Sequence, residues 1–529
     1  MKSIWIDDVI DNLTNGFSVN NNINPPNAAN LGDEDNDFNS IGDLDYRDAG
    51  ANGVPMITQI YQFDNERWIE VTNVSTTASI NPNFVKVSLF KDKTGDQTDE
   101  IPDASFTVTS TLAPGQSVIF RNATNSITNI NNAAVDITNN NLTDIEGAND
   151  IVILSNFVDA TSFANRYDIV TSFPNKTSFV RIDETLVPNT TYTPSEWVVF
   201  IDDALDTFTQ SADANLGRHP HDPLVSEIIN SDTDANTLLG LHRIDITTRT
   251  AGSWNNGFPD RSRFVIVDED YSHTGNRLSA RKLTVNASRK LGVTDNLLVV
   301  TNDVVLNGDI RLINSTGATG NSAAQFIQTH TSSSLVTGTS GRLLVDQNST
   351  VSSIYRYDYM SSPVKETSGS ATFSLTNIFK DGSNPTDFNS TIGTTIAKDI
   401  NFIGGFDGSF TANAISLPNY WIYTFETDGS TPANWERVQS FGNINNPDGF
   451  IFKGPGKAQN YTFMGVPKDG TLTTPVRSFE SYLIGNPFAS AISVKEFIER
   501  DGLRLNDEKK LLIAATAVML TFGMRDYLI

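Results

Sequence analysis

Closely spaced carboxylates near the N-terminus form one group of residues in this sequence that could bind a metal ion. Asp33, Asp35 and Asp37 occupy alternate positions, and Asp43 and Asp45 follow them. Ca²⁺ is a hard cation that takes roughly six to eight oxygen ligands, and alternating carboxylates on a tight loop can supply them. The pattern therefore predicts a Ca²⁺ site at these five aspartates, and Ca²⁺ is the only cofactor that the sequence suggests. A solvated acidic linker accounts for the same residues without a metal.

Other reactive groups are sparse. His219 and His221 are two residues apart with Asp222 beside them, which could suit a transition metal if the segment were a strand. We prefer a proline-rich loop with two surface histidines, because no third ligand follows at a diagnostic spacing. The acidic run 268–270 has nothing that separates it from other solvated carboxylates. The common metalloprotease, serine-hydrolase and phosphate-loop motifs do not occur. We therefore predict no catalytic residue and no enzyme activity.

Aromatic side chains are better candidates for a function than the carboxylates. Those that could stack on sugar rings are Trp254, Tyr355, Tyr357, Tyr359, Tyr420 and Trp421. Aromatic residues also favour strands and bury large areas, so the same side chains could simply fill the interior of a sandwich. For the alternating tyrosines at 355, 357 and 359 we expect the interior position.

Charge and composition exclude several partners. The 529 residues carry a formal net charge of -25, which repels the phosphates of nucleic acids and of anionic membranes. The absence of Cys excludes thiol catalysis but fixes no cellular compartment. The apolar run 511–520 is shorter than the roughly 20 residues that a membrane-spanning helix needs. We expect neither a nucleic-acid partner nor a membrane span.

The segments that would position these residues are predicted to be β-strands. Ile57–Phe63 and Arg67–Asn73 alternate with period two, and Asn-, Gly- and Asp-rich turns follow at short intervals. Between 276 and 352, apolar pairs recur every few residues: Leu283/Val285, Leu291/Val293, Leu297/Val299, Val304/Leu306 and Ile310/Leu312. This rhythm favours a short β-solenoid over an ordinary meander. The fold class is predicted to be all-β.

The chain divides into six predicted segments. They are an Asp/Asn-rich acidic linker (1–54), an immunoglobulin-like sandwich (55–204), a connector (205–275), a β-solenoid-like stalk (276–352), a second β-sandwich (353–500) and an atypical apolar tail (501–529). For the tail we expect a buried or frayed helix, or a segment foreign to the rest of the chain.

Residues 55–204 resemble the lamin-tail domain. That family has a strand with Glu and Asn, a Pro-Gly turn and a final Arg and Trp pair. The matching residues are Glu70, Asn73, Pro114, Gly115, Arg181 and Trp197. The resemblance implies an immunoglobulin-like, non-catalytic domain that serves binding or scaffolding.

A second resemblance covers the C-terminal half. The segments YRYDYMSSPV, GFIFKGPG, YTFMGVPKDG and LIGNPFASAI, preceded by the Trp254–Asp260 connector, are similar to a block in large exported proteins of flavobacteria and other Bacteroidetes. Such proteins typically carry a signal peptide and a sorting domain for type IX secretion. Because Met1–Asp8 lacks the apolar core of a signal peptide, we expect the chain to be a section of a longer precursor.

Together these patterns predict a non-catalytic binding or adhesion protein, extracellular or at the cell surface, that contacts a glycan or a protein. The alternative is an accessory, non-catalytic region of a secreted hydrolase. The same modules accompany such enzymes, so the residues alone do not separate the two.

Overall fold

The computed structural model describes most of the chain between Gly53 and Ala491. The described residues are 53–63, 66–93, 97, 101–123, 135–142, 145, 147, 149–156, 160–175, 177–201, 242–274, 278–314, 323–328, 336–338, 340–382, 397–411, 415–426, 431–470, 472, 481–492, and the strands 13–14, 16–17, 510–515 and 518–523. The chain forms two compact units, Met1–Ile246 and Thr247–Ile529, each of which is described by itself.

Strands dominate both units. The described part of the chain contains one α-helix, the four-residue α3 (Leu375–Ile378), besides short 3-10 turns. The predicted all-β fold class is confirmed. No helix among the described residues has the length and apolar character needed to cross a membrane.

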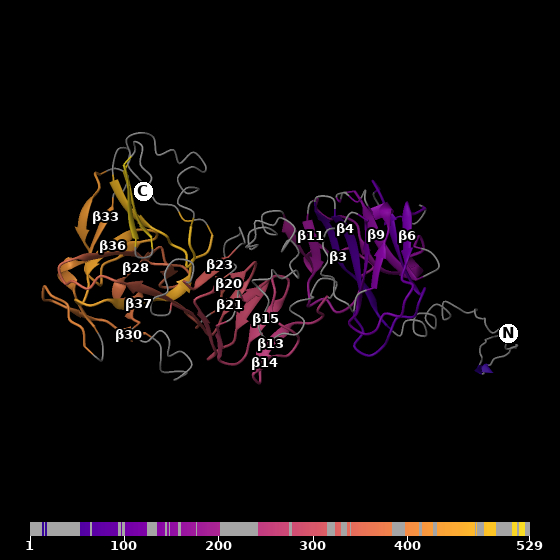
Figure 1. The fold of residues 1–529 in the computed structure, drawn as a ribbon, viewed down its shortest axis with the longest axis horizontal. Helices are drawn as coiled ribbons and strands as arrows, with labels where there is room; N and C mark the ends of the chain where they lie inside the picture. The colour runs from indigo at the N-terminus through magenta and orange to yellow at the C-terminus, as the bar shows by residue number, and fades with distance from the viewer. Residues whose placement is uncertain are drawn as a thin grey trace. The chain divides into compact units, whose positions relative to one another are not determined.

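The first unit is a two-sheet sandwich. Its strands are β3 (Pro55–Phe63), β4 (Glu66–Asn73), β5 (Val85–Phe90), β6 (Ala104–Thr107), β7 (Ser117–Arg121), β8 (Val135–Thr138), β9 (Ile151–Asn156), β10 (Arg166–Val170), β11 (Thr177–Arg181) and β12 (Trp197–Ile201), with the separate pair β1 (Leu13–Thr14) and β2 (Gly16–Phe17). One sheet has the order β12-β11-β3-β4-β7-β8 and the other β10-β9-β5-β6. In Figure 1, β3, β4 and β11 lie side by side. The immunoglobulin-like type of this sandwich stays a prediction.

A bulge in β3 modifies the expected alternation. The register against β4 shifts between Ile57 and Gln59, so Ile57 and Ile60, three residues apart, both reach the apolar core. On the other face of this sheet Tyr61 stacks on Trp68 with 3.8 Å between ring centroids. That face is also buried, as Tyr61 and Trp68 are almost inaccessible to solvent.

The second unit begins with a parallel β-solenoid. Its strands are β13 (Thr247–Thr250), β14 (Ser253–Trp254), β15 (Phe264–Val267), β16 (Tyr271–His273), β17 (Leu278–Ala280), β18 (Lys282–Val285), β19 (Lys290–Thr294), β20 (Leu297–Val300), β21 (Val304–Leu306), β22 (Asp309–Ile313), β23 (Gln325–Gln328), β24 (Val336–Thr337) and β25 (Leu343–Ser349). Parallel pairing builds three faces, β13-β15-β18-β21-β24, β16-β19-β22-β25 and β17-β20-β23. Figure 1 shows β13 beside β15 and β20 beside β23.

Aliphatic ladders fill the solenoid, as the apolar pairs predicted. Val265, Leu283 and Val304 follow one another in register on successive coils, and all are buried. The predicted pairs point inward except at β20, where Leu297 is only half-buried and Leu298 takes the inward position. The coils also start earlier than expected, because β13 already pairs in parallel with β15 inside the stretch 205–275 assigned to a connector.

Glycines allow the coils to stack closely at one corner. A Cβ on Gly341 would lie 2.1 Å from the carbonyl oxygen of Gly308, and a Cβ on Gly308 would lie 2.2 Å from that of Asn286. Both distances are far inside van der Waals contact. The backbone of successive coils therefore occupies the space that any other side chain would need.

We expect Gly341→Ala to destabilise the solenoid by roughly 1–3 kcal/mol, the usual cost of overpacking a tight site. Thermal unfolding of the full chain, with peptide-resolved hydrogen exchange, would locate the loss in β21–β25. Gly369→Ala is the matched control, since nothing lies within 4 Å of its added Cβ. Equal stability of the two variants would contradict the close packing at this corner.

The last coil passes into further sheets. Strand β25 pairs antiparallel with β37 (Gln459–Pro467), which also pairs with β27 (Val364–Lys365) and β29 (Phe379–Asp381). A second sheet has the order β26 (Tyr357–Ser361), β36 (Gly449–Lys453), β33 (Tyr423–Glu426), β34 (Asn434–Arg437). Smaller pieces are β28 (Thr372–Phe373), β30 (Lys398–Asp399), β31 (Asn401–Ile403), β32 (Ser416–Pro418) and β35 (Ile444–Asn445). Rings from the two sheets meet at Phe379, which contacts Phe452 and Phe463.

The apolar tail forms strands, and the expected helix is wrong. Strand β39 (Lys510–Ala515) pairs in parallel with β38 (Ser481–Gly485) and antiparallel with β40 (Val518–Gly523). The apolar run 511–520 is therefore interrupted between two strands. A short apolar run fits a buried strand as well as a helix, which periodicity alone does not separate.

Candidate functional site

Four aromatic rings meet at the surface of the second unit. Tyr357, Phe406, Tyr420 and Trp421, here called the aromatic platform, contact one another edge to face. Ring centroids are 4.9 Å apart for Phe406 and Tyr420, 4.7 Å for Tyr420 and Trp421, and 6.3 Å for Tyr357 and Trp421. Phe406 is 59% exposed and Tyr420 38% exposed, whereas Tyr357 and Trp421 are half-buried. The platform therefore offers apolar surface to solvent from rings that hold one another in place.

Short connections place these rings together. The 3-10 turn η7 (Asn419–Trp421) follows β32 directly, and the Asn419 side chain accepts a hydrogen bond of 2.9 Å from the Ser440 amide. Phe406 lies in the loop between β31 and β32, where the Trp421 indole donates a 2.8 Å hydrogen bond to its carbonyl oxygen. Backbone hydrogen bonds between Ser409 and Ser416 close the same loop. The rings are thus fixed by polar contacts at their base.

Cationic side chains lie over the rings. The Lys453 amine is 3.8 Å from the centroid of Trp421 and 5.4 Å from that of Tyr357, its partner across β26 and β36. The Arg437 guanidinium on β34 lies 5.1 Å from the centroid of Tyr420. Such contacts attract a cation to the electron-rich face of a ring and hold it there.

Tyrosine hydroxyls complete the surface. Burial raises the pKa of Tyr357 above its ordinary value, and the neighbouring hydroxyls of Tyr423, Tyr359 and Tyr420 raise it further. The Tyr357 hydroxyl therefore stays neutral at physiological pH and can donate as well as accept hydrogen bonds. The surface combines apolar ring area, the Tyr357 hydroxyl and positive charge, which suits recognition of a polar ring molecule.

The other predicted aromatic residues lie elsewhere. Tyr355 precedes β26 and is 75% exposed, so it does not belong to the tyrosine strand. Tyr359 is half-buried beside Ile451. The expectation that these tyrosines fill the interior is wrong for Tyr355 and holds only in part for Tyr357 and Tyr359. Trp254 lies in the solenoid, edge-on to Tyr271 at 5.5 Å.

The metal predictions fall outside the described residues. Asp33, Asp35, Asp37, Asp43 and Asp45 of the predicted Ca²⁺ site lie there, and so do His219, His221 and Asp222. Across the described ranges, the structure contains no group of three or more His, Asp or Glu side chains that could hold a metal ion.

The acidic run 268–270 serves the solenoid. Asp268 accepts a hydrogen bond of 2.8 Å from Asn286, and Asp270 accepts one of 2.8 Å from the Lys290 amide. Both oxygens of Glu269 accept from the Gly252 amide at 2.9 and 2.7 Å. These carboxylates bind backbone and side chains of adjacent coils, so their contacts are structural.

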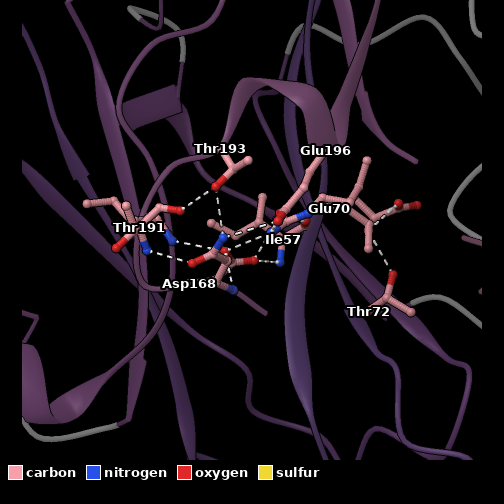
Figure 2. A network of polar contacts seen from close by, with 11 residues as sticks. Ile57, Glu70, Thr72, Asp168, Thr191, Thr193 and Glu196 are labelled. Carbon is pink, nitrogen blue, oxygen red and sulfur yellow. Dashed lines mark hydrogen bonds and ion pairs between the residues drawn. The ribbon is translucent and has the colours of Figure 1, made fainter. Parts of the chain in front are cut away.

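The residues that carry the lamin-tail resemblance hold the first sandwich together. Arg181 donates to Asp168 at 2.8 and 3.2 Å and to Glu196 at 2.9 Å. Its guanidinium also lies 4.6 Å from the ring centroid of Trp197, its neighbour across β11 and β12. Asn189 closes the ring of contacts, since its amide reaches Asp168 and its side chain reaches Glu196. Figure 2 shows this network, with Asp168 close to Ile57 and Glu196.

Asp168 is fully buried in this network. Burial raises its pKa, while Arg181 and the amides of Ile57 and Asn189 oppose that rise. Glu70 accepts a 2.6 Å hydrogen bond from Thr58, whose hydroxyl lies 2.8 Å from that of Thr72. These contacts give the acidic and basic residues structural partners.

Asn73 secures the Pro-Gly turn. Its backbone carbonyl accepts from the Gly115 amide at 2.8 Å, and its side chain donates to the carbonyl oxygens of Ala78 and Leu112. Gly115 adopts a positive φ of 76°, a conformation that glycine tolerates best. Pro114 precedes it, which places the predicted turn motif at the end of β4.

Comparison with protein-family models finds no match, and comparison with curated proteins finds none either. Nothing in these comparisons bears on the lamin-tail or exported-protein resemblance. Both stay predictions that rest on the residues quoted for them.

Proposed function

We propose that this chain is a non-catalytic binding section of an exported, cell-surface protein, and that it contacts extracellular glycans through the aromatic platform. The observation that carries the proposal is the solvent-exposed pair Phe406 and Tyr420, held edge to face at 4.9 Å. The C–H faces of sugar rings are apolar and pack against aromatic side chains, while sugar hydroxyls need polar partners. Rigid Tyr and Trp side chains supply both at low entropic cost.

The remaining architecture is consistent with this role. The lamin-tail and flavobacterial resemblances favour surface proteins, and a stack of parallel coils makes a stiff support for a binding domain. The catalytic alternative would need convergent reactive groups, and the carboxylates with described contacts have structural partners instead. Export and surface location remain part of the proposal.

Trp421→Ala should weaken glycan binding by about 2 kcal/mol, roughly a 30-fold rise in Kd, because Trp421 contacts all three other rings of the platform. A glycan array with the full chain would first identify ligands, and isothermal titration would then compare variants. Phe406→Ala provides a second test. Its ring is more exposed than that of Trp421, so its removal should disturb the interior less.

Phe163→Ala in the first unit is the matched control. That ring is 54% exposed and, like Trp421, has a cation over its face, with the Arg166 guanidinium 4.5 Å from its centroid. Its loss should leave the Kd unchanged within twofold. A full chain that binds no glycan, or glycan binding that survives both platform variants, would refute the proposed function.

A further inference from the structure

We infer that the aromatic platform selects anionic polysaccharides, whose sugars carry carboxylate or sulfate groups, over neutral ones. The inference rests on the proposed function and adds the ligand's charge to it. Its basis is the pair of cations Lys453 and Arg437, which lie over platform rings in a chain with net charge -25, together with Lys457 over Phe410, a ring of the same loop as Phe406.

Each of these cations makes a cation–π contact with an aromatic ring. Lys453 lies over Trp421 at 3.8 Å, Arg437 over Tyr420 at 5.1 Å and Lys457 over Phe410 at 4.2 Å. Phe410 belongs to the same loop as Phe406 and is itself partly exposed. Ring contacts restrict the long side chains before any ligand binds, which reduces the entropy lost on association.

The same cations have no carboxylate partner among the residues that the structure describes. Other basic residues of the chain do have one: Arg311 pairs with Asp346 at 3.1 Å and Lys380 with Asp399 at 2.8 Å. Because these three ring-bound cations have no described counter-charge, their positive charge is available for an external anion.

Two acidic residues near the platform, Glu436 and Asp407, could offset the charge of the cations. Glu436 precedes Arg437 on β34, and successive side chains of a strand point to opposite faces, so Glu436 faces away from Tyr420. Asp407 follows Phe406 and is exposed. Two cations, Lys453 and Arg437, thus lie over platform rings, with the exposed carboxylate of Asp407 beside Phe406.

The strongly negative total charge does not oppose the inference at physiological salt. The Debye length is then about 8 Å, so distant carboxylates are screened and the nearest cations dominate the local field. Nucleic acid carries a much higher charge density along its backbone, so the many carboxylates of this acidic chain would repel it more strongly. A polysaccharide with at most a few charges per repeat, and with apolar ring faces between them, fits the alternation of cations and aromatic rings better.

The test compares polygalacturonate with its fully methyl-esterified form, which has the same rings without the charge. The full chain should bind polygalacturonate at least about tenfold more tightly at about 0.15 M salt, where distant carboxylates are screened, and the preference should shrink at about 1 M salt. The double variant Lys453→Gln/Arg437→Gln should lose the preference while it keeps weak binding of the neutral form. Lys282→Gln is the control, because Lys282 lies 4.4 Å over the Phe264 ring on the solenoid.

The possible outcomes separate the two proposals. Equal affinity for the charged and esterified polymers would overturn the inference and leave the proposed function intact. Binding of neither polymer, together with an empty glycan array, would remove both. Equally tight binding of poly-glutamate or of a single-stranded oligonucleotide through Lys453 and Arg437 would also overturn the inference, because the site would then recognise anions without regard to sugar.

Discussion

Replacing Arg181 with alanine should lower the free energy of unfolding of the first sandwich by about 3–5 kcal/mol. Arg181 is almost inaccessible to solvent and bridges the buried Asp168 to Glu196. Its removal leaves the buried Asp168 carboxylate without its described counter-charge. The loss is then dominated by the desolvation of one uncompensated ion, which exceeds the value of the ion pair itself.

The geometry explains why no neighbour can replace Arg181. It donates to both Asp168 oxygens, donates to the carbonyl of Ile57 at 3.1 Å, and covers the Trp197 ring. These partners lie on β10, β3 and β12, so a single guanidinium joins three strands from both sheets. Lysine would keep the charge but lacks the planar fork, so Arg181→Lys should recover only part of the lost stability.

Peptide-resolved hydrogen exchange on the full chain would measure the loss, since it reports β3, β10 and β11 separately from the second unit. Arg121→Ala, a half-buried arginine on β7 of the same sheet, should cost clearly less. The double variant Arg181→Ala/Asp168→Asn should be more stable than Arg181→Ala, because it no longer buries a lone charge. If the single variant proved as stable as the wild type, the network would not be a stabilising element.

The sequence predicted strands well because their signal is local. Alternation in Ile57–Phe63, and apolar pairs such as Leu283/Val285, report which side chains share a face. The bulge at β3 and the early start of the solenoid at Thr247 were not predictable in this way. A bulge is defined by its register against the partner strand. The first coil of a solenoid is recognisable only by its pairing with the next coil, which the local sequence does not show.

The aromatic platform was predicted only in part. Tyr357, Tyr420 and Trp421 were candidates because of their residue type, but Phe406, Lys453 and Arg437 were missed. Tyr357 and Lys453 are cross-strand neighbours separated by nearly a hundred residues, and no local spacing indicates that pairing. The one available signal was the basic Lys453 and Lys457 beside a turn in an acidic chain.

Period two also leaves open which face of a strand is buried. The tyrosines of β26 were expected inside, yet Asp358 and Met360 are the buried residues and Tyr357 and Tyr359 stay half-exposed. The inward face holds a carboxylate because Ser349 donates a short hydrogen bond to Asp358 Oδ1. A polar partner supplied by β25 thus decided the orientation, and the strand's own sequence does not contain that information.

This orientation has a large consequence for stability against pH. Burial raises the pKa of Asp358 to about 6, although the Ser349 hydroxyl opposes the rise. Burial also raises the pKa of Asp448 to about 6, with Glu426 adding to it and the Tyr482 hydroxyl, 2.7 Å away, opposing it. Lys468 is a further titratable neighbour of Asp448: burial lowers its pKa well below the ordinary value, and Asp448 opposes that fall.

The sign follows from proton binding. Both carboxyls titrate at 3.8 when unfolded and at about 6 when folded, so between these values the folded state holds protons that the unfolded state has lost. The stabilising contribution of the two protonated carboxyls to the free energy of unfolding is therefore complete below pH 3.8. It is lost as pH rises from 3.8 to about 6, and it no longer changes at higher pH. Each group lowers stability at neutral pH by roughly 2–3 kcal/mol relative to a permanently neutral side chain.

Asp358→Asn and Asp448→Asn should accordingly stabilise the second unit at pH 7.5 by about 2 kcal/mol each, because an amide keeps the acceptor oxygen for Ser349 or Tyr482 without the buried charge. Calorimetry of the full chain from pH 4 to 7.5 would show the wild-type midpoint falling as pH rises towards about 6, and that of the double variant falling less. The exposed Asp407→Asn should follow the wild type. Destabilisation by both substitutions at pH 7.5 would mean that the folded protein prefers the ionised carboxylates, which would contradict the raised pKa of Asp358 and Asp448.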